Sequence, residues 1–250
     1  MPWVRTTRIL LVPEFSELEW TIRPQLEQWA EVASYDSPGV GSESVPDEEL
    51  ERMAGDAAHR RARVAERGLE EVQRRGWERF VVVADGGGNP SACLVASARP
   101  EAVAGIALGH ACLSLEHEGA RAPIHAEVQA ALLNLVDRDR EEFVRHAMTQ
   151  LTGGSYDEEL AGQMLERVPL NLLTRGWLRG GDEPGDRLIG ELDIPLLLVK
   201  HEDCLMFTEE GYEDAVRALP RGLTGAVSDK PSVSGEFAEL LREFCERLSY

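Results

Sequence analysis

The sequence predicts an α/β fold in which a mostly parallel sheet of about six strands is flanked by helices. Short aliphatic runs alternate with longer helical patterns along the 250-residue chain, as in sheets whose strands are joined by helical crossovers. Most of these runs are continuously apolar, which is typical of strands buried on both faces. One stretch between two strands is too long for a single crossover, so we also predict an inserted helical cap.

Each predicted strand is one of the short apolar runs. These are Arg8–Val12, Val32–Tyr35, Phe80–Ala84, Val103–Leu108, Pro195–Lys200 and Leu223–Val227. The intervening segments have helical periodicity. The predicted helices are Pro24–Ala30, Asp47–Arg75, Pro90–Ala98, Glu209–Ala218 and Gly235–Arg247.

The predicted cap lies between Leu108 and Pro195. Its amphipathic segments are Ile124–Val136, Asp139–Leu151, Tyr156–Arg167 and Leu170–Arg179. Ser155 and Glu158 form an S-x-x-E capping box at the start of the third segment. We therefore divide the chain into a core, residues 1–113 and 186–250, and a cap, residues 114–185.

Composition excludes several classes of function. Lys and Arg number 26 against 45 Asp and Glu, which gives a net charge of −19, and the pI is near 4.7. Such a polyanion repels nucleic acids and anionic membrane surfaces. The four cysteines are widely spaced, and His117 and His125 lack the spacing of metal ligands, so we expect no disulfide framework, metal or cofactor. The N-terminal apolar run is too short for a signal sequence, and we expect a cytoplasmic protein.

Three segments carry a resemblance to a known family. The first, ILLVPEFSELEWTIRPQLEQWAEVASYDSPGVGS, ends in Asp36-x-Pro38-Gly39-x-Gly41-Ser42. The second is FVVVADGGGNPSACLVASARPEAVAGIAL, and the third runs from DIPLLLVKHEDCLMF to GEFAELLREFC. In order and spacing they resemble the α/β-hydrolase superfamily, in particular its capped epoxide hydrolases, haloalkane dehalogenases and esterases. The resemblance implies an α/β-hydrolase fold that lacks the family's first two antiparallel strands.

The catalytic positions depart from the family, leaving a degenerate triad. Aligned without gaps, the nucleophile position falls on Gly86, which has no side chain to attack a substrate. A shift of one residue would instead make Asp85 the nucleophile. The family's catalytic His is missing between the last strand and the final helix, and the acid position falls on Asp203 or Cys204. We therefore do not expect a conventional serine hydrolase.

Other candidate residues retain polar chemistry at the same edge of the sheet. The resemblance implies an oxyanion-hole-like pair of backbone N–H groups at Phe15 and Gly87, although Glu14 or a water could fill the space between them. Glu14 is either a proton donor or acceptor, or a solvated turn carboxylate. Asp85 is either catalytic or a structural hydrogen-bonding group. His110 and His201 follow strand ends and are either functional or satisfied polar neighbours.

The leading hypothesis is an enzyme of the lyase, isomerase or cyclase type. It would act on a small apolar carbonyl compound through the N–H pair, with Glu14, Asp85 or His110 moving a proton. One alternative is a pseudo-hydrolase that binds a ligand or a partner without catalysis. Another is a hydrolase with Asp85 as nucleophile. A homodimer is also compatible with the sequence.

Overall fold

The computed structural model describes most of the chain outside the predicted cap. The described residues are 7–109, 134–135, 138–139, 142–143, 145–146, 158–169, 171–173, 192–201, 212–213, 216–217 and 222–248. Several sequence predictions lie outside them. These are the candidate residues His110, Asp203 and Cys204, the capping residue Ser155 and most of the other cap helices.

The core is one six-stranded parallel sheet, as predicted. The strands are β1 (Thr7–Val12), β2 (Ala30–Ala33), β3 (Phe80–Asp85), β4 (Val103–Gly109), β5 (Leu196–His201) and β6 (Gly222–Val227). Their order is β2-β1-β3-β4-β5-β6, and every neighbouring pair is parallel. The direction of strand succession reverses between β1 and β3. In parallel sheets, ligands bind outside the carboxyl ends of the strands at such a reversal.

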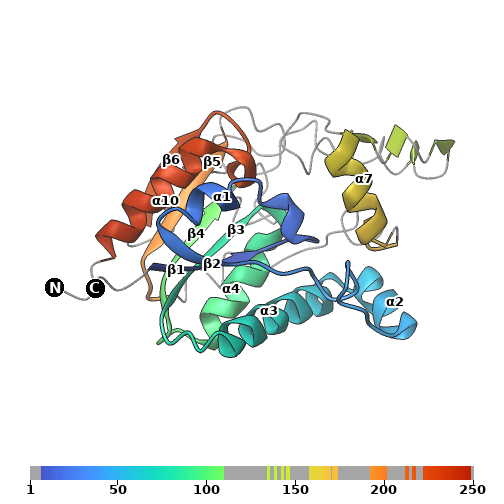
Figure 1. The fold of residues 1–250 in the computed structure, drawn as a ribbon, viewed down its shortest axis with the longest axis horizontal. Coiled ribbons are helices and arrows are strands. Elements are labelled where there is room, and N and C mark those ends of the chain that lie inside the picture. The colour runs from blue at the N-terminus through green and yellow to red at the C-terminus, as the bar shows by residue number, and fades with distance from the viewer. Residues whose placement is uncertain are drawn as a thin grey trace.

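Helices cover both faces of this sheet (Figure 1). α3 (Ala57–Arg74) and α4 (Asn89–Ala98) pack on one face, and α1 (Arg23–Leu26) and α10 (Gly235–Arg247) on the other, whereas α2 (Asp47–Gly55) and α7 (Glu158–Arg167) lie to one side of the sheet. The single helix predicted over Asp47–Arg75 is two helices. Asp56 has an extended backbone with φ −131°, and its side chain accepts a hydrogen bond of 2.9 Å from His59 N at the start of α3. An aspartate is a favourable N-cap, and here it begins a second helix.

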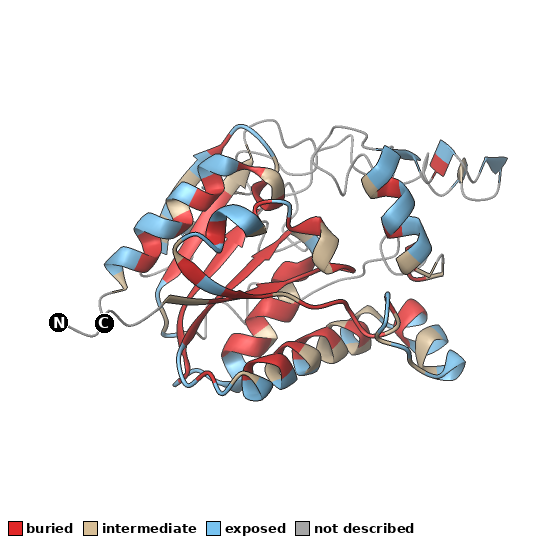
Figure 2. Cartoon of the chain, viewed as in Figure 1, coloured by how far each residue is buried: buried red, intermediate tan, exposed pale blue. Residues whose placement is uncertain are grey.

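Alternate strand residues face opposite layers. Leu10, Val12 and Val82 share a buried cluster with side chains of α3 and α4. Leu11 and Val81 pack in a second cluster, with side chains of α1 and α10. Figure 2 shows the strands as the buried centre between these helices. Burial on both faces accounts for the continuously apolar runs in the sequence.

A third apolar cluster joins part of the predicted cap to the core. Met164 of α7 and Phe143 pack with Met53 of α2 and with Phe15, in the loop that follows β1. Figure 1 shows α7 next to α2, at the side of the molecule away from the chain termini. The cap helix α7 therefore lies over the loop that begins at the carboxyl end of β1.

Asp36 fastens α7 to this loop. Its buried carboxylate accepts hydrogen bonds from Ser16 Oγ at 2.8 Å and from Glu17 N at 3.2 Å, and it also binds the Arg167 guanidinium. The Gly41 N–H donates to the Arg167 carbonyl at 3.0 Å. The Asp36-to-Gly41 segment, quoted above for the family resemblance, thus holds both the end of α7 and the loop after β1.

Replacing Arg167 by methionine tests this anchor. The Arg167→Met variant leaves the buried Asp36 carboxylate without its cation, so we expect the free energy of unfolding to fall by about 2 kcal/mol. Urea denaturation measures the change. In the matched control, Arg242→Met, the lost pair with Glu246 is exposed, and a change below about 0.5 kcal/mol is expected. Equal effects of the two variants would contradict the anchoring role.

Candidate functional site

The candidate site lies at the carboxyl ends of β1 and β3, where the strand order reverses. Val12 and Ala84 are paired near the ends of these strands. The loop that begins at Pro13 therefore meets the Gly86–Gly88 turn, a short 3-10 helix (η2) between β3 and α4. Two segments about seventy positions apart in sequence come together because their strands are neighbours.

Each glycine of this turn meets a different steric requirement. Gly86 has φ +54°, a left-handed conformation that favours glycine, and no described atom lies within 4 Å of a Cβ placed there. A Cβ on Gly87 would lie 2.2 Å from Glu14 Cδ, and one on Gly88 would lie 2.7 Å from the Val12 carbonyl oxygen. The turn can thus approach both β1 and the Glu14 side chain. Of these three positions, only residue 86 has no described atom in the place of a side chain.

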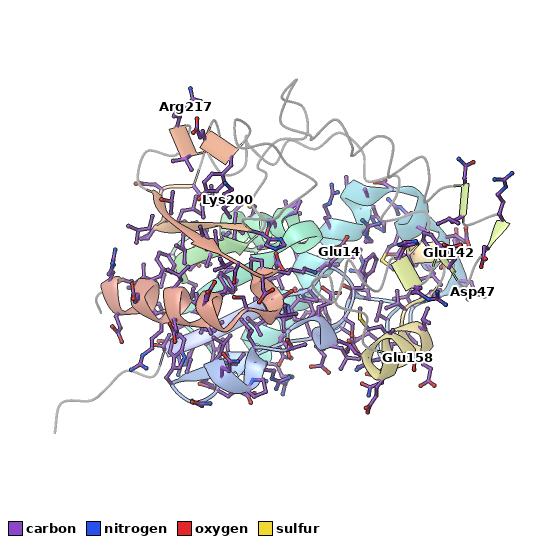
Figure 3. All side chains as sticks on the ribbon, turned by 90° about the horizontal axis from the view of Figure 1, so that it is seen from above. Glu14, Asp47, Glu142, Glu158, Lys200 and Arg217 are labelled. Carbon is purple, nitrogen blue, oxygen red and sulfur yellow. The ribbon has the colours of Figure 1, made fainter. Side chains whose placement is uncertain are left out.

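Glu14 brings a carboxyl group directly against the turn. Figure 3 shows Glu14 near the middle of the view, whereas the labelled Asp47, Glu142 and Glu158 lie on outer helices. Glu14 is half-buried. Removal from water raises the pKa of Glu14, and the nearby Asp85 raises it further; Arg60, Lys230 and Arg61 act in the opposite direction. The carboxyl therefore keeps its proton to a higher pH than an ordinary glutamate.

Glu19 occupies the backbone N–H groups of the same loop. It ends a short 3-10 helix, η1 (Glu17–Glu19). Its carboxylate accepts from Glu14 N at 3.1 Å, Phe15 N at 2.7 Å and Ser16 N at 2.8 Å. Burial, and then the neighbouring Glu14, raise the pKa of Glu19 to about 7. The Phe15 N–H is thus bonded within the protein, not free to bind a substrate oxygen as predicted, because the Glu19 carboxylate that forms a capping box with Ser16 also accepts from Phe15 N.

Asp85 is the last residue of β3 and lies beneath the turn. It is buried, with an extended backbone of φ −139°. Its Oδ2 accepts a hydrogen bond of 3.1 Å from Ser232 N and lies 4.0 Å from Lys230 Nζ. Both partners come from the segment between β6 and α10, where the family resemblance places a histidine. A lysine and a backbone N–H from that segment approach the site instead.

Two arginines of α3, Arg60 and Arg61, also act electrostatically on Glu14, and they were not predicted as site residues. Burial is the main cause that lowers the pKa of Arg60, and it lowers that of Arg61 to about 10. Only 6% of Arg60 is exposed. The sequence did contain a sign that Arg60 is buried. Arg60 stands four residues before Val64 and twelve before Val72, and this spacing places it on the buried face of α3.

His201 is the remaining described candidate. It ends β5, at the same edge of the sheet as Asp85, and is half-buried. The structure thus brings Glu14, Asp85 and the Gly86–Gly88 turn together, and adds Glu19 and three cations to them. Among the described residues, no group of three or more His, Cys, Asp or Glu side chains is arranged to hold a metal ion. The helices described contain no stretch long and apolar enough to cross a membrane.

The contact between Glu14 and Gly87 can be tested by a double-mutant cycle. In the native background, Gly87→Ala forces its methyl group into the Glu14 carboxyl and should cost about 2 kcal/mol of unfolding free energy. In a Glu14→Ala background the obstacle is gone, and we expect the cost to shrink by at least about 1 kcal/mol. Urea denaturation of the four proteins gives the coupling. The same cost in both backgrounds would contradict the contact.

The raised pKa of Glu14 predicts a pH-dependent effect of Glu14→Gln. A carboxyl whose pKa is higher in the folded state stabilises the fold below its unfolded pKa of about 4.5, and this stability is lost as pH rises through the folded pKa. Glutamine does not ionise, so the Glu14→Gln variant does not lose this stability as the pH rises. The unfolding free energy of Glu14→Gln relative to the native protein should therefore be higher at pH 8 than at pH 5. The matched control is Glu78→Gln, which replaces an exposed glutamate.

Comparison with known proteins gives structural but not sequence relatives. No protein-family model matches the chain, and no curated protein matches its sequence. A hydrolase from Oleispira antarctica superposes with a TM-score of 0.73 and 13% identity, covering 97% of this chain and 92% of that chain. An esterase from Rhodococcus sp. ECU1013 superposes with a TM-score of 0.70 and 19% identity, covering 98% of this chain and 92% of that chain. The 2-hydroxy-6-oxo-6-phenylhexa-2,4-dienoate hydrolase of Rhodococcus sp. strain RHA1 superposes with a TM-score of 0.73 and 15% identity, covering 96% of this chain and 91% of that chain.

These similarities span nearly the whole chain. Together with the parallel sheet and the helices on its two faces, they show that the chain has the α/β-hydrolase fold. The fold predicted from the three sequence segments is therefore confirmed. Because a fold hosts many activities, the chemistry has to be argued from the residues of the site.

Proposed function

We propose that this protein is an enzyme that moves protons on a small, largely apolar carbonyl compound, as lyases, isomerases and cyclases do. The observation that carries the proposal is the Glu14 carboxyl, desolvated and in contact with the turn at Gly87, beside a nucleophile position occupied by Gly86. A site without a nucleophile but with a carboxyl that retains its proton suits acid–base chemistry. The substrate named for the Rhodococcus sp. strain RHA1 hydrolase carries an oxo group and a phenyl group, which agrees with such a ligand.

In the proposed reaction Glu14 is the acid and Asp85 the base. Glu14 donates its proton to the carbonyl oxygen while Asp85 takes the proton from the neighbouring carbon. The electrons of the broken C–H bond form the carbon–carbon double bond of an enol, and those of the carbonyl π bond form the new O–H bond. Reversal returns a proton to carbon. Two carboxyls in different environments can divide the roles of acid and base in this way.

The surroundings of Asp85 support its role as the base. The Ser232 N–H donates to its Oδ2, and the ammonium group of Lys230 lies 4.0 Å from the same atom. Both contacts hold the Asp85 carboxyl in place at the end of β3. Glu14, by contrast, is half-buried against the turn. Removal from water favours its neutral form.

A second candidate function is ligand binding without catalysis. Glu19 favours it, because its carboxylate takes the N–H groups of Glu14, Phe15 and Ser16 that would otherwise face a substrate oxygen. In that case Glu14 holds the ligand by a hydrogen bond and transfers no proton. The test below separates the two, since binding alone produces no exchange at carbon.

Exchange of α-hydrogens for deuterium tests the proposed chemistry. Native protein in D2O is incubated with 4-phenyl-2-butanone, 4-phenyl-2-oxobutanoate and related aryl ketones, and deuterium incorporation is followed by NMR. We expect faster exchange with at least one ketone, and a loss of about 100-fold or more in Glu14→Gln and in Asp85→Asn. Glu78→Gln should retain the native rate. If native protein accelerates none of these exchanges, or Glu14→Gln is fully active, the acid–base proposal is wrong.

Ester hydrolysis tests the remaining alternative, in which Asp85 is a nucleophile. We expect no hydrolysis of short p-nitrophenyl esters above the buffer blank, either by the native protein or by Gly86→Ser. The serine would project into open space, but the segment between β6 and α10 supplies no histidine to activate it. Native turnover that is lost in Asp85→Asn would instead support a hydrolase. A covalent adduct on Asp85, seen by mass spectrometry, would establish it.

A further inference from the structure

An arginine at the site is buried without a matching acceptor. Arg60 is 94% buried, and its Nη1 has no hydrogen-bond partner among the residues that the structure describes. Its interaction with Glu14 is electrostatic, without a hydrogen bond between the two side chains. A guanidinium has five N–H donors and no acceptor, and a buried donor left without a partner costs free energy. Arg60 therefore has unused capacity to bind an acceptor from outside the chain.

The surrounding charges favour an anion over a neutral acceptor. Arg61 and Lys230 also act on Glu14, so three cations converge on one carboxyl. Burial raises the pKa of Glu14 and raises that of Glu19 to about 7, so these two carboxyls counter the cations less than ordinary glutamates would. In a chain with a net charge of −19, this part of the site gathers three cations, of which Lys230 also lies 4.0 Å from Asp85 Oδ2. Such a region attracts anions and holds them strongly where water is excluded.

We infer that the ligand of this site carries a carboxylate, which Arg60 binds from α3 while the carbonyl group of the same molecule meets Glu14 at the Gly87 turn. The inference rests on the proposed function, because it takes the surroundings of Glu14 as the substrate site. A planar guanidinium matches a carboxylate with two parallel hydrogen bonds. A dianion such as a phosphate monoester fits less well, since the Asp85 carboxylate shares the site. The substrate class is thus a small apolar oxo acid.

Calorimetric titration with benzoylformate tests this inference. Benzoylformate has an aryl group, a ketone and a carboxylate but no hydrogen on the carbon next to the ketone, so it can bind but cannot undergo the proposed exchange. We expect native protein to bind it at least 10-fold more tightly than the neutral benzoylformamide, and more tightly than phenyl phosphate. Arg60→Gln should weaken benzoylformate binding by about 10- to 100-fold, as for the loss of a charge-assisted pair. Arg60→Lys keeps the charge but not the two parallel donors, so its affinity for benzoylformate should lie between those of the native protein and Arg60→Gln.

Controls separate a binding role from a folding role. Arg52→Gln removes an exposed arginine of α2 and should bind benzoylformate as the native protein does. Urea denaturation and near-UV circular dichroism identify any Arg60 variant that fails to fold, in which case Arg60→Lys and the comparison of the anion with the amide decide. The inference is wrong if benzoylformate and two other aryl oxo acids all fail to bind, if the amide binds equally well, or if folded Arg60→Gln binds normally.

The two proposals fail separately in these experiments. Suppose that benzoylformate binds in an Arg60-dependent way but no ketone exchanges deuterium. This result would support the proposed ligand class and contradict the proposed enzymatic activity. Glu14-dependent exchange in 4-phenyl-2-butanone, with no preference for 4-phenyl-2-oxobutanoate, would support the proposed enzymatic activity. It would contradict the inference that the ligand carries a carboxylate. An exchange rate that is higher for the oxo acid, and that falls toward the neutral ketone's rate in Arg60→Gln, would support both.

Discussion

The parallel pairing of β1 with β3 is the constraint on which the site depends. It places the loop after Val12 against the turn after Asp85, so closely that side chains cannot be accommodated at two positions of the turn. The loop keeps its shape because Glu19 binds three successive N–H groups and Asp36 binds the next one, at Glu17. The position of Glu14 thus follows from strand register and from hydrogen bonds that its neighbours make. It does not require any strong interaction of the Glu14 carboxyl itself.

Electrostatics at the site run against those of the whole molecule. A strongly acidic chain gathers Arg60, Arg61 and Lys230 near Glu14, the first two from the N-terminal part of its longest described helix. The carboxyls and arginines here stabilise one another only in part, because removing each charged group from water costs free energy. The result is a set of groups whose proton affinities depart from their usual values, which is common where a protein carries out chemistry or binds a ligand.

The sheet could be predicted from the sequence because strands buried on both faces leave continuous apolar runs. The break at Asp56 was missed because the residues on both sides have helical periodicity. The Ser16-to-Glu19 capping box was readable from the S-x-x-E pattern, and it would have placed the Glu19 carboxylate beside the backbone of this loop. Arg60 could have been found from the buried face of α3. Lys230 could not, because its approach to Asp85 depends on how the segment after β6 crosses the sheet.

The hydrogen bond from Ser232 to Asp85 also bears on how the protein assembles. It joins residues 147 positions apart, and contacts of such long range form late, because the ends of a long loop must first be brought together. During synthesis on the ribosome, β1, β2 and β3 can pair while the C-terminal strands are still being made. The base of the proposed reaction gains its backbone donor only when the last fifty residues have joined the sheet. A nascent or truncated chain would therefore contain most of the core and yet lack a finished site.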